Sequence, residues 1–399
     1  MTDPTTLPVL PEVRQIEGEM VALRRQIHAH PELGFEEKLT GELVASRLES
    51  WGYEVARGVG RTGVVGTLRC GRGQRRLGLR ADMDALPITE LSGLPHASRR
   101  PGLMHACGHD GHTATLLAAA RVLALARGFS GTLHLIFQPA EEGLGGAQAM
   151  LDDGLFERFP CDRLFAFHNS PGAPAGRLGI RAGVVYSSSD TAVITVRGRG
   201  GHGAKPHLAV DPIVAASHVV IALQSIVSRE VHPNEMAIVT VGAFHAGDAP
   251  NVIPASAELR LTIRARSEAV RAQLRDRITA VAHAQAAVHG ATAEVDYRWR
   301  YPVTVNDEAA TAWLRDVARE TMGEAALIPD WPPGTASDDL GLMLQRVPGC
   351  YFNVGNGTDE RPGQGGCPVH NAGYDFNDRI LPSTASLFVR VARKYLVEA

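Results

Sequence analysis

One short stretch, residues 104–114, constrains this chain more than any other. It reads Met-His-Ala-Cys-Gly-His-Asp-Gly-His-Thr-Ala, so three histidines, one cysteine and one aspartate fall within His105–His112. Imidazole, thiolate and carboxylate are the groups that bind borderline-soft divalent cations in proteins. The small residues between them let several such groups converge without backbone clashes. We predict a metal site with Cys107 and His109 as ligands; the alternative is a polar loop with scattered histidines.

The overall composition indicates an ordinary globular protein. The 399 residues are 44% hydrophobic and 21% charged, with a formal net charge of −3, so two or three domains are expected and nucleic acid is not an expected partner. No apolar run approaches the roughly 20 residues of a membrane helix, and residues 1–11 lack the pattern of a secretory signal. The five scattered cysteines fit a reducing compartment. We therefore predict a cytoplasmic location.

The hydrophobic patterns in the first 170 residues alternate between strand and helix. Strand-like segments are followed by helical stripes, which favours an α/β sheet with helices on both faces. The same character returns after residue 300. The segments that carry this interpretation are helices 13–27, 39–51 and 113–126, strands 53–59, 63–68, 77–81, 132–137 and 164–167, and, near the C-terminus, helices 308–321, 338–345 and 381–397 with strand 350–354.

The middle of the chain follows a different order. Strand 190–196, helix 210–227, strands 237–244 and 257–265, helix 269–288 and strand 291–297 follow one another. The order β-α-β-β-α-β is that of a ferredoxin-like domain. We predict a discontinuous first domain, residues 1–184 plus 301–399, interrupted by a second domain, residues 185–300.

Two acidic motifs and two further histidines follow apolar strands or loops. Asp82 and Asp84 follow one strand, and Glu141 and Glu142 follow another. In open α/β sheets, ligands bind at the carboxyl ends of strands. Adjacent residues in extended backbone point to opposite sides, so one glutamate can bind a metal while the other faces a bound water. His168 ends a further strand, and His370 follows the Gly- and Pro-rich loop 355–369.

Other motifs lack the context that their usual function requires. The G-x-G-x-x-G match at residues 58–63 precedes a strand, and the match at 198–203 is separated from the next helix by prolines, so neither predicts a dinucleotide site. The chain contains neither G-x-S-x-G nor H-E-x-x-H, the patterns of common serine and one-zinc hydrolases. Asp110 and His112 are interpreted as supports for the metal site. Whether Asp82 or His105 binds metal directly stays open.

With these motifs in view, the chain resembles the M20 metallopeptidase family, in the amidohydrolase branch with aminoacylases, hippurate hydrolases and auxin-conjugate hydrolases. The resemblance runs from Arg24 to the C-terminal helix. It is carried by the segments 24–33, 81–87, 105–112, 138–142 and 251–254, together with His370. It implies a catalytic α/β domain with an inserted ferredoxin-like lid domain, which often carries the dimer interface.

The resemblance also implies roles for particular residues. It makes Glu141 the general acid/base and Asp84 a carboxylate that orients a ligand. It makes His202 a contact of the developing oxyanion, in dimers from the neighbouring subunit, and it makes Asn251 and Arg264 substrate-holding residues. The implied ligands of two divalent ions (Zn, Mn, Co or Ni) are Cys107, His109, Glu142, His168 and His370.

We therefore expect a di-metal amidohydrolase that cleaves N-acyl amino acids, of the N-acetyl or N-benzoyl type, into a carboxylic acid and a free amino acid. A homodimer or higher homo-oligomer formed through the lid is expected. The alternatives are a dipeptidase or aminopeptidase on the same scaffold, and a non-catalytic metal-stabilised binding protein. Many relatives carry Ser-Glu-Asp-Phe where this chain has Ser337-Asp338-Asp339-Leu340, so the preferred acyl group and amino acid are not carried over.

Overall fold

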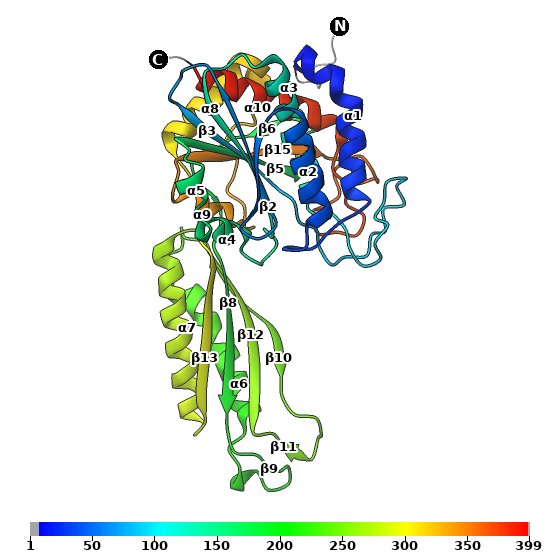
Figure 1. Cartoon of the computed structure of the whole chain (residues 1–399). Helices are drawn as coiled ribbons and strands as arrows, with labels where there is room; N and C mark the ends of the chain where they lie inside the picture. Colours follow the sequence, from blue (N-terminus) through cyan, green and yellow to red (C-terminus); the bar gives the residue numbers. More distant parts are fainter. Residues whose placement is uncertain (1–7, 398–399) are drawn as a thin grey trace. The chain divides into compact units, whose positions relative to one another are not determined.

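The computed structural model describes residues 8–397, which divide into two compact units (Figure 1). The first unit is built from three pieces of chain: residues up to Val185, Val305–Pro332, and residues from Leu342 onward. The second unit consists of Tyr186–Thr304 and Pro333–Gly341.

A seven-stranded mixed sheet forms the middle of the first unit. Its central strands β4, β3, β5 and β15 run parallel, whereas β1, β2 and β6 run antiparallel to their neighbours. Nearly every residue of β3 and β15 is buried, as expected for parallel strands that are covered on both faces. The predicted α/β class is thus confirmed. Across the sheet the strands are β1 (Glu54–Val59), β2 (Gly63–Cys70), β4 (Gly131–Gln138), β3 (Arg76–Asp82), β5 (Arg163–Pro171), β15 (Gly349–Gly357) and β6 (Leu178–Gly179).

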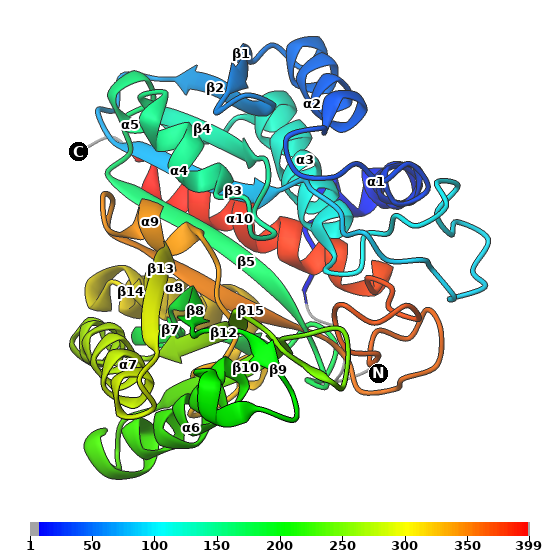
Figure 2. The same cartoon turned by 90° about the horizontal axis from the view of Figure 1, so that it is seen from below.

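The longest helices of the first unit pack on one another as well as on the sheet. Helix α3 contacts α1 and α10, and Figure 2 shows these helices side by side. In α1, buried apolar residues recur at helical spacing, and Pro11 at the first turn suits a helix start. The helices are α1 (Pro11–His28), α2 (Lys38–Ser50), α3 (His109–Ala126), α4 (Gly146–Asp152), α5 (Leu155–Arg158), α8 (Glu308–Met322), α9 (Leu340–Leu344) and α10 (Leu381–Tyr395), with short turns η3 (Glu324–Ala326) and η4 (Asp378–Ile380).

Helix α3 begins at His109, four residues before the predicted start at Thr113. The prediction followed the Ala- and Leu-rich run, but Gly108 in the left-handed region (φ 93°) starts the helix earlier. A Cβ atom at Gly108 would lie 2.4 Å from Asn169 Oδ1 and 2.5 Å from Tyr374 Oη, so only glycine fits there. As a result, His109 lies in the first turn of a buried helix.

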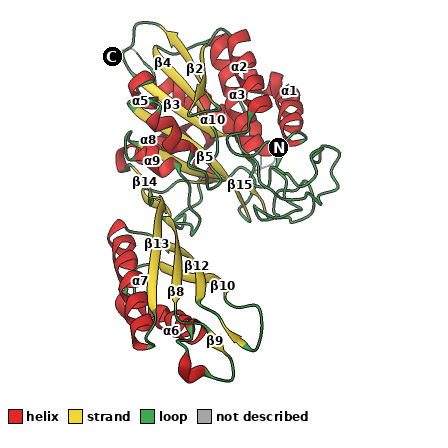
Figure 3. Cartoon of the chain, turned by 60° about the horizontal axis from the view of Figure 1, so that its bottom comes forward, coloured by secondary structure: helices red, strands yellow, loops and turns green. Residues whose placement is uncertain are grey.

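The second unit is a four-stranded antiparallel sheet with two helices. Along the chain it contains β8 (Ser189–Arg197), α6 (Pro212–Ser225) continued by η2 (Ile226–Glu230), β10 (Ala237–His245), β12 (Ser256–Ala265), α7 (Glu268–Val288) and β13 (Thr292–Tyr301). The spatial order is β10-β12-β8-β13. The two helices contact each other on one face of the sheet (Figure 3), and burial alternates along β8 and β12 accordingly. Two short strand pairs, β9 (Gly201–His202) with β11 (Val252–Ile253) and β7 (Gly183–Tyr186) with β14 (Thr304–Asn306), were not predicted.

One helical stretch corrects the expectation that no run is long enough to cross a membrane. Among the described residues, Pro212–Glu230 has the length and apolar composition of such a span. Its residues Ala215, Val219 and Leu223 are buried in the core of the second unit, and α6 contacts α7 and β12. The apolar composition of this stretch is therefore used, at least in part, for packing against its own sheet.

Candidate metal centre

The parallel strands of the first unit deliver their polar residues to one edge of the sheet. Strand β3 ends at Asp82, which lies opposite Gln138 at the end of β4. Asp84 follows shortly after the end of β3, and the pair Glu141–Glu142 follows shortly after the end of β4. His168 lies near the end of the neighbouring strand β5. The loop and first turn that carry Cys107 and His109 meet this edge.

Several groups of three donor atoms lie within 4.8 Å of one another at this edge. Two of these groups share Cys107, and together they include every residue that the sequence predicted as a metal ligand. A single thiolate could therefore serve two neighbouring ions. The groups in the first unit are Cys107–His109–His168, Cys107–Glu142–His370, His109–Glu141–Glu142 and Asp82–His109–His112.

Hydrogen bonds to the protein set which ring nitrogen of each histidine can bind a metal. His168 Nδ1 lies 2.6 Å from the Asn169 carbonyl oxygen, which can only accept, so Nδ1 carries the proton. His168 Nε2 then presents its lone pair 3.4 Å from Cys107 Sγ. His109 Nδ1 likewise donates to Asp84 Oδ1 at 3.2 Å. In both imidazoles Nε2 is thus the ring nitrogen that would be available to a metal ion.

Asp84 holds two predicted ligands at once. Its Oδ1 accepts from His109, and its Oδ2 accepts the backbone N–H of Glu142 at 2.9 Å. Glu142 Oε1 lies 3.1 Å from His370 Nε2 but has no hydrogen-bond partner of suitable geometry. His370 itself has φ 62°, an uncommon value for a residue with a side chain, and its N–H donates to the carbonyl oxygen of Ala106. The loop before His370 is therefore tied to the segment that carries Cys107.

The electrostatics of this edge fit a divalent cation. Among residues 8–397, His109 Nε2 and Glu142 Oε1 are buried without a hydrogen-bond partner of suitable geometry, which is unfavourable for polar atoms removed from water. Burial, together with the nearby Glu142 and Glu141 carboxylates, raises the pKa of the Cys107 thiol well above its usual value. Burial also lowers the pKa of His168 to about 3, which keeps that imidazole neutral. A cation would supply the missing partners and stabilise the thiolate, so the residues present fit a divalent metal ion.

Glu141 lies beside the donor groups on a strained turn. Its carboxylate is within 4.8 Å of donor atoms of His109 and Glu142, and its side chain is buried. The preceding residue, Ala140, has φ 53°, and such values in residues other than glycine concentrate at functional sites. Donor atoms of Glu141, Glu142 and His109 therefore lie within 4.8 Å of one another, and Glu142 Oε1 lies in addition 3.1 Å from His370 Nε2.

Asp82 and His105, for which direct metal binding was left open by the sequence, have different surroundings. Asp82 is buried, with Oδ2 2.6 Å from Arg80 Nη1 and Oδ1 2.6 Å from His112 Nδ1. Both of its oxygens are therefore engaged by the protein, although it belongs to one of the donor groups. His105 is fully buried, and neither ring nitrogen has a hydrogen-bond partner within the described part of the chain. His105 belongs to none of the donor groups found among residues 8–397.

A buried polar network behind the cluster contains the predicted supports Asp110 and His112, together with residues that were not predicted as part of the site. Arg24 donates to Asp110, Asp375 and Asp378, and His28 donates to Asp110 at 2.9 Å. On the other side, His112 Nε2 lies 2.7 Å from Asn169 Oδ1, and Asn169 Nδ2 donates to Tyr374 Oη. The sequence could have indicated that Arg24 and Arg80 belong to such a network. Each is a charged residue within an otherwise apolar pattern of buried positions, and a buried arginine requires partners.

A further buried carboxylate, Glu37, predicts a pH dependence of stability. Its oxygens accept from Thr62 Oγ1 at 2.5 Å and from the N–H of Ala140 at 2.8 Å. Burial raises the pKa of Glu37 to about 7, against the opposing Thr62 hydrogen bond. Because the folded state then binds more protons than the unfolded state, stability from this group is present below about pH 4.5 and is lost as pH rises through about 7. We expect Glu37→Gln to remove this loss, which amounts to roughly 2–3 kcal/mol.

The measurement is urea unfolding of both proteins between pH 4.5 and pH 8, since only the difference between them isolates Glu37. Glu36→Gln, at an exposed neighbouring position, is the control for the change in charge. Parallel stability profiles for wild type and Glu37→Gln would show that Glu37 does not titrate in this range.

The residues predicted outside the first unit lie at two ends of the second unit. His202 pairs with Val252 in the β9–β11 ladder, and the N–H of Gly203 donates to the Asn251 carbonyl oxygen at 2.8 Å. His202 and Asn251 are therefore neighbours. Arg264 lies near the opposite end of β12, where its Nη1 donates to Ser337 Oγ at 2.7 Å. The strand from Ser256 to Arg264 spans roughly 26 Å, so the second unit does not bring Arg264 close to His202.

Comparisons of this chain with protein families, curated proteins and solved structures agree with one another. Residues 78–394 match the Peptidase family M20/M25/M40. Hippurate hydrolase of Campylobacter jejuni is 43% identical over 97% of this chain and 99% of its own. An IAA-amino acid hydrolase of Arabidopsis thaliana is 38% identical over 95% of this chain and 86% of its own. A solved Bacillus subtilis structure, described as a dinuclear metal binding peptidase of the M20 family, is 30% identical with a TM-score of 0.81 and covers 96% of this chain and 99% of its own. This chain therefore belongs to the M20 peptidase family.

Proposed function

We propose that this protein is a metal-dependent amidohydrolase that cleaves N-acyl amino acids into a carboxylic acid and a free amino acid. The observation that carries the proposal is the convergence of five candidate metal ligands with Glu141, a buried carboxylate beside them that is not one of the five. The similarity to enzymes named for hippurate and for IAA-amino acid conjugates supports the acyl amino acid as the substrate class.

The proposed cofactor is a pair of divalent ions. The Cys107–His109–His168 and Cys107–Glu142–His370 groups would each hold one ion, with Cys107 common to both. The dinuclear description of the Bacillus subtilis relative supports this number. Thiolate and imidazole donors favour Zn, Co or Ni over Mg and Ca, and the carboxylate of Glu142 would also suit Mn.

When bound, such ions lower the pKa of a coordinated water from about 15.7 to about 7 and polarise the substrate carbonyl. Glu141 would take the proton from that water and deliver it to the leaving amine, because its carboxylate is buried beside the donors and is not needed as a ligand. Asp84 would keep the Nε2 lone pair of His109 directed at the metal by holding the Nδ1 proton.

The second unit is proposed to act as a lid and dimerisation domain, corresponding to residues 185–300 inserted into a catalytic domain of residues 1–184 and 301–399. Asn251 and Arg264 are the proposed substrate-holding residues. His202 is the proposed oxyanion donor. Its Nδ1 accepts from the N–H of Ala204 at 3.1 Å, so the neutral ring carries its proton on Nε2 and can donate from there.

A homodimer would reconcile the positions of these residues. If Arg264 and His202 serve the same active site, their separation within one second unit requires His202 to come from another copy. Strand β10 forms one edge of the four-stranded sheet and offers unpaired backbone groups to such a copy. The five cysteines are all free thiols, which supports a cytoplasmic location for the assembly.

Subunit complementation tests this arrangement. His202→Ala and Glu141→Gln are each expected to lose activity, by about 10²–10³-fold for His202→Ala. After the two variants are mixed and allowed to exchange subunits, half of the dimers are mixed and each mixed dimer has one complete site. About a quarter of wild-type activity is therefore expected to return. Light scattering establishes the dimer, and a mixture as inactive as its parts, or a fully active monomer, would rule out the role in trans.

A substrate panel separates the amidohydrolase from its alternatives. N-benzoylglycine and N-acetyl amino acids are expected to be cleaved with kcat/KM at least about tenfold higher than dipeptides, because the ammonium group of a dipeptide would lie close to the metal ions. A preference for dipeptides would favour the peptidase function. If no amide is cleaved while added metal still raises the melting temperature, the protein is a metal-stabilised binding protein.

A further inference from the structure

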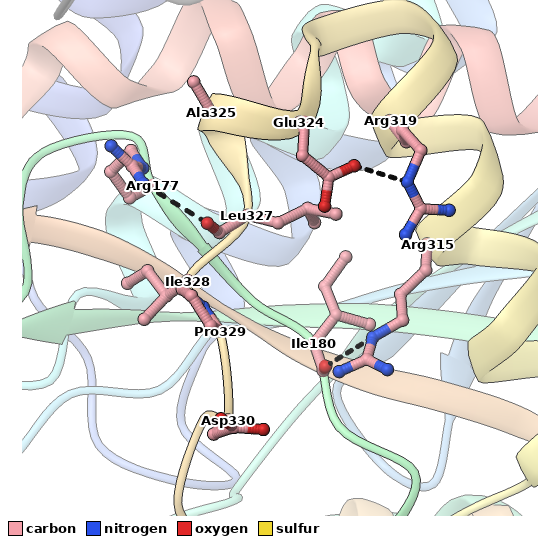
Figure 4. Close-up of a pocket in the computed structure, with 10 residues that line it drawn as sticks. All are labelled: Arg177, Ile180, Arg315, Arg319, Glu324, Ala325, Leu327, Ile328, Pro329 and Asp330. Carbon is pink, nitrogen blue, oxygen red and sulfur yellow. Dashed lines mark hydrogen bonds and ion pairs between the residues drawn. The ribbon is translucent and has the colours of Figure 1, made fainter.

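The first unit contains a cavity that shares no residue with the metal-binding groups. It has a volume of about 390 Å³ and lies between the edge strand β6, the end of α8 and the segment that follows η3. Figure 4 shows Arg315 and Arg319 on one side of this cavity and Arg177 on the other. We call it the arginine cavity.

Backbone carbonyl groups hold two of these arginines in place. Arg315 Nε donates to the Ile180 carbonyl oxygen at 3.0 Å, and Arg177 Nη2 donates to the Leu327 carbonyl oxygen at 3.2 Å. Within residues 8–397, neither guanidinium has a carboxylate within 4.0 Å. Arg177 Nε is in addition buried without a hydrogen-bond partner. These two cations are thus fixed by neutral carbonyl groups and not by ion pairs.

A smaller adjoining cavity of about 280 Å³ continues this arrangement. It shares Arg315 and Asp330 with the arginine cavity and adds Arg181. Arg181 Nη1 donates to the Trp331 carbonyl oxygen at 2.7 Å, and its Nε is also buried without a partner. Arg319 differs, because it is paired with Glu324 and Asp316.

The lining of the two cavities therefore has an excess of positive charge. Four arginines face two acids, and one of those acids, Glu324, is already paired with Arg319. Like charges held close together by neutral groups repel one another, and a buried N–H without a partner is unfavourable. An anion with several acceptor oxygens would relieve both, and a guanidinium matches such oxygens with two parallel hydrogen bonds.

We propose that the arginine cavity binds the oxyanion group, phosphate or carboxylate, of a small molecule. Its volume lies within the range of small-ligand sites, about 300–1,000 Å³. The exposed Asp330 is also part of the lining, where its negative charge would disfavour an anion placed close to it. This inference stands apart from the proposed hydrolase function, because it uses none of the metal-binding residues.

The test is calorimetric titration of the metal-loaded enzyme with inorganic phosphate and, separately, with succinate. Any binding of these anions at the metal centre is the same in every protein compared, so only differences between variants are interpreted. Arg315→Gln and Arg177→Gln are each expected to weaken binding by at least about tenfold. Arg315→Lys keeps the charge but loses the paired hydrogen bonds and should fall between wild type and Arg315→Gln.

Arg197→Gln, the same change at an exposed arginine of the second unit, is the matched control and should bind as wild type does. The tighter of the two anions identifies the preferred group. Should Arg315→Gln fail to fold, Arg177→Gln carries the same test. The proposal is overturned if both anions give the same isotherm with wild type and with the folded Arg315 and Arg177 variants, or if Arg197→Gln weakens binding equally.

Discussion

Replacing Glu141 by Gln is expected to reduce kcat on N-benzoylglycine by about 10²–10⁴-fold while leaving the metal content unchanged. The glutamine has nearly the shape of glutamate but cannot take a proton from water. Glu141 lies within 4.8 Å of His109 and Glu142 donor atoms without being needed as a ligand, so its loss should affect proton transfer and not metal binding. Steady-state kinetics and elemental analysis of the purified variant measure the two effects.

The neighbouring glutamate is the matched control. Glu142→Gln removes a proposed ligand that lies 3.1 Å from His370 Nε2, so it should lose metal as well as activity. The two adjacent substitutions thus separate a proton carrier from a ligand. If Glu141→Gln keeps most of its turnover with full metal content, another group carries the proton.

Removing the metal ions with a chelator is expected to lower activity by at least about 10³-fold and to lower the melting temperature. The catalytic loss follows because several kcal/mol of charge stabilisation disappear with the ions, and each 1.36 kcal/mol is tenfold in rate. The loss of stability follows because ions that bind only the folded state stabilise it. It also removes the cation beside His109 Nε2 and Glu142 Oε1, two buried atoms that have no hydrogen-bond partner among residues 8–397.

Adding back Zn, Mn, Co and Ni one at a time should restore activity to different extents and thereby rank the metals. Cys107→Ala should bind fewer ions than wild type and recover no activity with any of them, because Cys107 belongs to both proposed metal groups. Cys70→Ala, at a half-buried cysteine outside these groups, is the control. Full activity of the chelated enzyme, verified as free of metal, would exclude metal-dependent chemistry.

Most helices and strands could be predicted from the sequence because each depends on a local periodicity of apolar residues. The alternation in β12 and the helical spacing in α1 both appear in the structure close to their predicted bounds. Errors occurred where a distant contact sets the boundary. Helix α3 starts early because Asn169 and Tyr374 leave room only for glycine at position 108. The two-residue strands β9 and β11 exist only as a pair, so neither has a periodic signal of its own.

Residues 104–114 show, within the site, the same difference between what the local sequence determines and what long-range contacts determine. Its imidazole, thiolate and carboxylate groups predict metal chemistry from their identity alone, since ligand preference is a property of the side chain. Which groups meet depends on the register of β3, β4 and β5, which brings Asp84, Glu142 and His168 from distant positions to one edge. The protonated ring nitrogens, the sharing of Cys107 between two groups and the arginine cavity all arise from such long-range contacts. No local pattern encodes them, because hydrogen bonds and burial depend on residues that are far apart in sequence.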